Sequence, residues 1–253
     1  HDSLNEVVRK TLLTYWNTVS FHALYAKASN FEVSQTPELK DRPLMDRWII
    51  SELNTLIQEV DAALEDFDSQ TAGRALARFI DDLSNWYVRR SRRRFWDGEA
   101  AALGTLHECL VTLTQLLAPL VPFITEQVWQ ELVRPTDSSA AASVHLTNWP
   151  VAQTSAIDSV LGTQVALTRR IVELCRATRA ESGIKIRQPL GRALIAASGW
   201  STLPEQMREQ IADELNVQTL EDIASADGDL VNISVKANFK SLGAKFGGAV
   251  QEI

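Results

Sequence analysis

Apolar residues recur at helical spacing along most of the chain before residue 180, which predicts a series of long amphipathic helices. Each stretch is bounded by residues that start or stop helices, such as Asp68 before the third helix and Gly98 after it. The expected helices cover residues 4–30, 44–64, 68–97 and 99–117, a fifth that begins at Pro122, and 157–180. Five amphipathic helices with short joints indicate one helical bundle over residues 1–134.

The pattern changes after this bundle. Residues 135–156 are predicted to form an exposed loop and a short extended return segment. Residues 157–253 begin with the last long helix and continue with short stretches that favour strands, at 192–197, 216–220 and 230–235, with a helix at 204–215. The chain is therefore expected to be mainly α, with a helical bundle followed by a small α/β domain.

Composition narrows the class of protein. The chain has 253 residues and a formal net charge of -7, so any contact with nucleic acid has to come from local basic patches. We find no signal peptide and no uninterrupted apolar run long enough to span a bilayer. The two cysteines, Cys109 and Cys175, lie in apolar helical patterns and are expected to be buried thiols in a reducing compartment. Because the chain starts at His1 without a methionine, we expect it to be part of a longer protein.

One stretch stands out against this acidic background. Five of the six positions from Arg89 to Arg94 are arginine, and Trp86 and Trp96 flank them. Guanidinium groups match phosphate geometry and stack on bases, and aromatic rings can hold unstacked RNA bases. The stretch therefore predicts an RNA-binding helix. The alternative is a salt-bridged seam between helices, because acidic residues are plentiful and successive helical side chains point in different directions.

No catalytic site is expected in this chain. The four histidines are not spaced as metal ligands, and no phosphate-binding glycine loop or nucleophile motif is present. The paired carboxylates Asp81 and Asp82 are typical of solvated surfaces. We therefore predict neither catalytic nor metal-binding residues.

Several motifs together resemble the C-terminal part of the isoleucyl-tRNA synthetases, a family of class I aminoacyl-tRNA synthetases. They are Met45-Asp46-Arg47-Trp48, residues 86–96, Leu117-Ala118-Pro119, Pro122-Phe123, residues 126–129, Ser143-Val144-His145-Leu146, residues 184–190 and residues 238–247. The resemblance covers essentially the whole chain. The bundle motifs fit the valyl and leucyl families almost as well, whereas the Trp-Tyr-Val-Arg-Arg run, residues 185–190 and the Asn-Phe-Lys-x-Leu-Gly segment favour the isoleucyl family.

This resemblance implies an anticodon-binding bundle followed by a small junction domain that also contacts tRNA. The family's two nucleotide-binding signatures and its editing region are absent from the sequence, so this chain by itself is expected to be inactive. It would position the isoleucine tRNA for ATP-dependent aminoacylation by a catalytic domain outside the chain, and ATP and magnesium would belong to that domain. We expect a cytoplasmic monomer whose partners are the tRNA and the catalytic domain, with no membrane contact.

The expected tRNA-binding residues form three groups, which are Trp86, Arg89, Arg90, Arg92, Arg93, Arg94 and Trp96; Lys185 and Arg187; and Lys240 and Lys245. For the second group, the alternative is a turn that Gly183 and Pro189 shape and in which Arg187 pairs with a carboxylate such as Glu181. For the chain as a whole, the alternative from another class is a helical module that docks a protein partner within a synthetase assembly.

Overall fold

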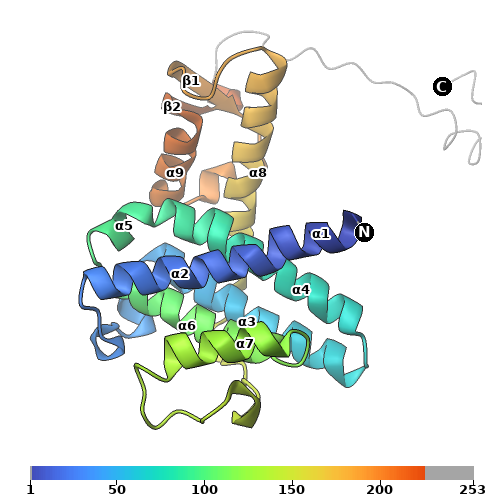
Figure 1. Ribbon diagram of the computed structural model, residues 1–253. Helices are drawn as coiled ribbons and strands as arrows, with labels where there is room; N and C mark the ends of the chain where they lie inside the picture. The colour runs from blue at the N-terminus through green and yellow to red at the C-terminus, as the bar shows by residue number, and fades with distance from the viewer. Residues whose placement is uncertain (1, 226–253) are drawn as a thin grey trace, which may run out of the picture. The chain divides into compact units, whose positions relative to one another are not determined.

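The computed structural model describes residues 2–225, and the chain divides into two compact units, residues 1–166 and 167–253. The described residues are predominantly helical, which confirms the mainly α prediction (Figure 1). The division falls inside helix α8 (Ser159–Glu181), whereas the sequence pattern places it before that helix, at residue 157. The difference arises because one continuous helix contributes residues to both units.

The first unit is a helical bundle. It contains α1 (Asp2–Val7), α2 (Leu13–Ala28), α3 (Leu44–Glu65), α4 (Ser69–Asp81), α5 (Arg92–Trp96), α6 (Ala100–Leu117) and α7 (Pro122–Val128). Three π-helical segments continue these helices. Residues 8–12 join α1 to α2, residues 82–88 extend α4 towards α5, and residues 129–133 extend α7 at its C-terminal end. The single third helix predicted for residues 68–97 is therefore interrupted, because the backbone leaves helical geometry at Ser91, where ψ is 7°.

Local sequence explains how these helices begin. A three-residue connection joins α3 to α4, and Phe67 takes a left-handed conformation there, with φ of 57°. Asp68 then caps α4, because its carboxylate accepts a hydrogen bond of 3.0 Å from the Thr71 amide. Pro122 occupies the first turn of α7, where its missing amide hydrogen costs nothing.

Helix α6 forms the centre of the bundle and packs against α2 and α3 (Figure 1). Its residues Leu103, Leu106, Leu110 and Leu113 are completely buried. By length and composition α6 resembles a membrane-spanning helix, but most of it is covered by other helices, as expected for the core helix of a bundle. Gly104 lets the connection between α2 and α3 approach α6 closely, since a Cβ atom there would overlap the Thr36 side chain.

The core of the bundle also contains two neutral histidines. His22 of α2 donates from Nε2 to the Leu103 carbonyl oxygen of α6 at 3.2 Å, and its ring lies 5.4 Å from that of His107. Burial, together with the neighbouring His107, lowers the pKa of His22 to about 3. Burial also lowers the pKa of His107 to about 4. Both rings are therefore uncharged in the folded chain near neutral pH.

The return segment of the first unit differs slightly from its prediction. Residues 143–150 were expected to be extended, and they contain a 3-10 turn at Val144–Leu146 with extended residues on either side. Glu126 of α7 holds this turn, because its carboxylate accepts hydrogen bonds from the Ser143 hydroxyl at 2.7 Å and the Val144 amide at 3.1 Å.

The second unit contains a strand-helix-strand element. Strands β1 (Leu190–Ile195) and β2 (Val217–Asp222) pair in parallel, with Leu190 opposite Val217, and α9 (Glu205–Leu215) connects them. A parallel pair requires such a crossover. The positions agree with the predicted strands and helix to within a few residues. The third predicted strand, 230–235, lies outside the described residues.

Gly73 and Gly104, which both lie in helices, should respond oppositely to substitution by alanine. Gly73 of α4 has open space around the position of a Cβ atom, so Gly73→Ala should stabilise the chain by about 0.5–1 kcal/mol through lower chain entropy in the unfolded state. Gly104→Ala should destabilise it by about 1–3 kcal/mol, because Thr36 has to move. Urea unfolding of both variants checks this contrast, and equal changes in unfolding free energy would contradict it.

The neutral histidines should make the bundle sensitive to acid. Above the ordinary histidine pKa of 6.5, neither the folded nor the unfolded chain protonates His22 or His107. Below it, only the unfolded chain binds the protons, so the free energy of unfolding should fall by up to about 1.4 kcal/mol per pH unit for each histidine. Chemical unfolding between pH 7 and 5 measures this slope. The double variant His22→Gln/His107→Gln should have a flatter profile, and an unchanged slope would refute the explanation.

Candidate nucleic-acid interface

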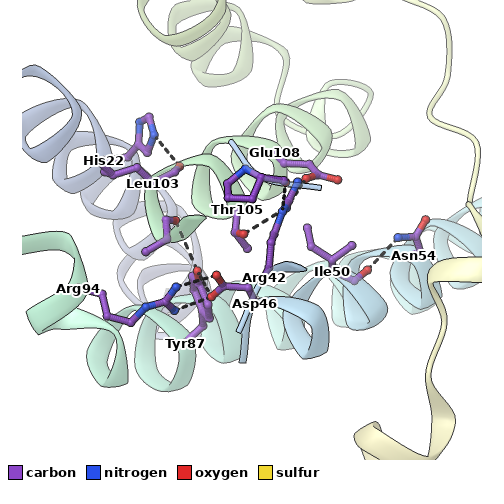
Figure 2. A network of polar contacts seen from close by, with 12 residues as sticks. His22, Arg42, Asp46, Ile50, Asn54, Tyr87, Arg94, Leu103, Thr105 and Glu108 are labelled. Atoms are coloured by element: carbon purple, nitrogen blue, oxygen red, sulfur yellow. Dashed lines mark hydrogen bonds and ion pairs between the residues drawn. The ribbon is translucent and has the colours of Figure 1, made fainter. Parts of the chain in front are cut away.

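Arg94 is anchored in the bundle by two carboxylates, Asp46 and Glu99, and Figure 2 shows the contact with Asp46. Its Nη1 and Nη2 atoms donate to the two carboxylate oxygens of Asp46 at 2.6 and 2.7 Å. Its Nε and Nη2 atoms donate to Glu99 at 2.8 and 2.7 Å. Asp46 belongs to α3 and is completely buried. Arg94 therefore joins α5 to α3 and to the start of α6.

Tyr87 completes this network. Its hydroxyl donates to Asp46 at 2.8 Å, and its ring packs edge-on against Phe95 with centroids 6.2 Å apart. Burial raises the pKa of Tyr87, so the hydroxyl stays protonated and serves as a donor. Burial disfavours the Arg94 charge, but the hydrogen bonds to Asp46 and Glu99 outweigh it and raise the pKa of Arg94. The same contact lowers the pKa of Glu99. The group is a charged and fully hydrogen-bonded network.

Arg90 and Trp86 also make a contact within the protein, because they pack against each other. The Trp86 side chain is 7% exposed, and the Arg90 guanidinium carbon lies 4.5 Å from the centre of its ring. This distance is typical of a cation–π contact. Trp86 therefore supports Arg90 within the protein and does not offer its ring to a base.

The remaining members of the arginine run lie on the surface. Arg89, Arg92 and Arg93 are exposed, and Trp96 is 76% exposed. Arg93 has a carboxylate partner, Asp97, with Nε and Oδ2 3.9 Å apart, but both side chains are well exposed and such a pair contributes little. The salt-bridged alternative therefore describes Arg94, which is a structural bridge, whereas Arg89, Arg92 and Arg93 form a basic surface.

A groove of about 350 Å³ lies beside this basic surface. Its lining comes from α2, from the π-helical segment 82–88 and from the arginines that follow, and consists of Asn17, Thr18, Phe21, Ser84, Asn85, Val88, Arg89 and Arg92. Its volume falls at the lower end of the range of about 300–1,000 Å³ typical of ligand pockets. Two arginines, two amides and two hydroxyls thus surround a small apolar surface.

Sequence reasoning did not identify the α2 side of this groove. Phe21 is expected from the periodic pattern of the first helix to be a core residue, and nothing in that pattern connects it or Asn17 with residues some 70 positions later. Asn85 begins the arginine-rich stretch, but the sequence alone does not predict a role for it. Asn17 lies on the exposed face of that helix, and a single exposed asparagine does not indicate a site.

The second predicted basic group lies in a turn of the second unit. Lys185 and Arg187 are exposed, in the connection between α8 and β1. Gly183 takes the left-handed conformation expected of it, with φ of 68°. The alternative pairing of Arg187 with Glu181 does not form, and within residues 2–225 neither basic side chain has a salt bridge.

Two further predictions concern Lys240, Lys245 and metal ions. Both lysines lie outside the described residues. Within the described part of the chain, no group of three or more His, Cys, Asp or Glu side chains is arranged to hold a metal ion.

Comparison with known proteins identifies the kind of domain. Residues 46–195 match the family described as the anticodon-binding domain of tRNA ligase. The chain is 57% identical over 254 residues to an isoleucine–tRNA ligase of Streptomyces avermitilis and 58% identical over 256 residues to that of Thermobifida fusca. It is 40% identical over 260 residues to that of Thermus thermophilus. These alignments cover 100%, 98% and 99% of this chain, which spans about a quarter (24%, 24% and 25%) of the length of these relatives.

Neighbouring arginines should differ sharply in their effect on stability. Arg94→Ala leaves the buried Asp46 carboxylate without its charge partner and should lower the free energy of unfolding by about 3–5 kcal/mol. Arg93→Ala removes an exposed arginine and should change it by less than about 0.5 kcal/mol. Urea unfolding of both variants tests the assignment. Similar values for the two would show that the Asp46 network does not support the bundle.

Proposed function

The chain belongs to the family of anticodon-binding domains of tRNA ligases, and on this premise we propose that it binds the anticodon loop of the isoleucine tRNA through the groove beside Arg89 and Arg92. The observation that carries the proposal is the combination of exposed cations with a groove lined by amides and hydroxyls. Arginines bind phosphates and fix the position of the RNA, whereas amide side chains can hydrogen-bond to base edges.

The groove suits a base that has left its stack. Sequence-specific readers of RNA usually hold such single-stranded bases against apolar or aromatic surfaces. Phe21 contributes that surface and is itself fixed by an edge-on contact with Phe95, with ring centroids 5.2 Å apart. Asn17 and Asn85, both exposed at the rim, supply donors and acceptors. In this proposal the groove reads a base and the two arginines hold the neighbouring phosphates.

Trp96 extends the same surface. It follows Arg92 by four residues in α5, so the two side chains lie on one side of that helix. An exposed indole beside cations is suited to stack on a second unpaired base. Trp86 and Arg94, which the sequence grouped with these residues, act in this proposal as supports inside the bundle.

Lys185 and Arg187 provide a second contact, to the RNA backbone. Both are exposed cations on one short turn, and they have the chemistry of a phosphate site. We assign them a role in affinity and not in recognition of sequence.

The activity of the whole protein is part of the same proposal. Relatives that are named isoleucine–tRNA ligase are about four times as long as this chain. We propose that a catalytic domain outside this chain uses ATP and magnesium to aminoacylate the tRNA, and that the present residues, inactive by themselves, hold the tRNA as a monomer. We place the protein in the cytoplasm, where the free thiols of Cys109 and Cys175 would remain reduced.

Binding of the chain to isoleucine tRNA across a salt series tests this function. Arg89→Ala and Arg92→Ala should each lower the slope of log K against log salt by roughly one unit if they contact phosphates. Trp96→Ala should weaken binding by about 1–3 kcal/mol if the indole stacks on a base. The same tRNA with an altered anticodon should bind more weakly at every salt concentration.

Two variants serve as matched controls. Arg78→Ala removes another exposed arginine of the bundle, which pairs with Glu59. Phe123→Ala removes an aromatic ring that is 90% exposed on α7. Neither should affect tRNA binding. If the control and test variants lose equal affinity for the tRNA, the contact is general charge attraction and not a specific site. If the tRNA with the altered anticodon binds as tightly as the unaltered one, the groove does not read a base.

A further inference from the structure

A buried arginine lies beneath the basic turn of the second unit. Arg179 of α8 is 5% exposed. Its Nη2 atom donates to the carbonyl oxygens of Lys185 at 2.9 Å, of Ile186 at 3.3 Å and of Gln188. One side chain therefore holds three successive parts of the turn that carries Lys185 and Arg187.

Two other features restrain the same turn. Gly183 ends α8 in the left-handed conformation, with the Ile184 amide bonded to the Arg179 carbonyl oxygen at 2.8 Å and the Gly183 amide to that of Ala180 at 3.1 Å. This arrangement is a Schellman motif. On the other side, Asn216 donates from its side-chain amide to the Arg187 carbonyl oxygen at 2.9 Å.

These contacts occupy every carbonyl oxygen from Lys185 to Gln188. Three accept from Arg179 and the fourth, that of Arg187, accepts from Asn216. The backbone of the turn is thus bound to the protein, while the Lys185 and Arg187 side chains are exposed. A backbone that is already ordered does not lose that entropy again when a ligand binds.

We propose that Arg179 is a positioning residue for tRNA binding, which holds the turn so that Lys185 and Arg187 meet the RNA phosphates in a fixed arrangement. This inference rests on the proposed function, because it assumes that the turn contacts RNA. Arg179 itself touches no ligand. It acts through the backbone of residues 185–188.

The buried charge of Arg179 is explained better by this positioning role than by a purely structural role. Within the described residues, Arg179 has no carboxylate within salt-bridge distance, so only the carbonyl dipoles at Nη2 stabilise its buried charge, and its Nε and Nη1 atoms have no hydrogen-bond partner. Burying a guanidinium in this way is costly. The retained charge adds to the positive potential of Lys185 and Arg187, and a low-dielectric surrounding extends such a field towards an approaching phosphate.

The test compares four forms of the 253-residue chain by their affinity for isoleucine tRNA: unsubstituted, Arg179→Gln, Lys185→Ala/Arg187→Ala, and the triple variant. Arg179→Gln should weaken binding about three- to tenfold, because the turn is then ordered only on binding. In the Lys185→Ala/Arg187→Ala background it should have no further effect. Arg179→Lys retains the charge and a hydrogen-bond donor, so it should bind the tRNA more tightly than Arg179→Gln does. It replaces Arg179→Gln in the comparison if the glutamine variant does not fold.

Trypsin provides a readout that needs no RNA. Release of the turn should speed cleavage after Lys185 and Arg187 in Arg179→Gln. The matched control is Arg208→Gln in the same unit, because Arg208 donates to the carbonyl oxygens of Trp200 at 3.2 Å and of Ser201 at 3.0 Å and so holds a turn without basic side chains. This control should change neither cleavage at Lys185 and Arg187 nor tRNA affinity.

The outcomes separate the inference from the function on which it rests. Equal weakening by Arg179→Gln in both backgrounds, or unchanged trypsin cleavage, would overturn the positioning role while leaving tRNA binding intact. No binding by the unsubstituted chain would overturn the proposed function, and with it any role of Arg179 in RNA contact. Loss of affinity confined to the background that retains Lys185 and Arg187 supports the inference.

Discussion

The buried carboxylate of Asp46 is the constraint on which the bundle's basic surface depends. It lies on α3 with no exposure to solvent, and Arg94 and Tyr87 both donate hydrogen bonds to it (Figure 2). A charge so far from water is tolerated only when it is paired and hydrogen-bonded, so these two residues have to be brought to it. The helix interruption at Ser91 and the packing of Phe95 are part of the arrangement that achieves this.

This constraint divides a run of similar residues into two classes. Arg94 points inwards to its carboxylates, and Arg90 lies against the Trp86 ring. Because helical neighbours point in different directions, the same packing turns Arg89 and Arg92 outwards to the groove. The fixed residues thereby set the positions of the exposed ones. An uninterrupted helix without the buried carboxylate would not hold the cations in this arrangement.

The second unit uses a related device with different acceptors. Arg179 is buried, whereas Arg94 is partly exposed, and Arg179 donates to backbone carbonyl oxygens instead of carboxylates. In both places a hydrogen-bonded guanidinium restrains a segment whose neighbouring cations are exposed. This arrangement lets a chain of net charge -7 carry compact basic surfaces, because local geometry and not the overall charge determines where an anion can bind.

The sequence by itself determined the class of fold, the order of the elements and the location of the basic groups. Hydrophobic periodicity and capping residues are local signals, so the strands β1 and β2 and most of the long helices were predicted to within a few residues, whereas the interruption at Ser91 was not predicted. Only the tertiary structure decided which arginines are exposed. The buried carboxylate that binds Arg94, that of Asp46, lies 48 positions away on another helix, and many acidic residues could have competed for the arginine. The α2 side of the groove could not be predicted for the same reason, because the groove is formed by segments that are distant in the sequence. The hydrogen bonds of Arg179 could not be predicted either, because every residue has a backbone carbonyl oxygen and the sequence does not show which of them accept.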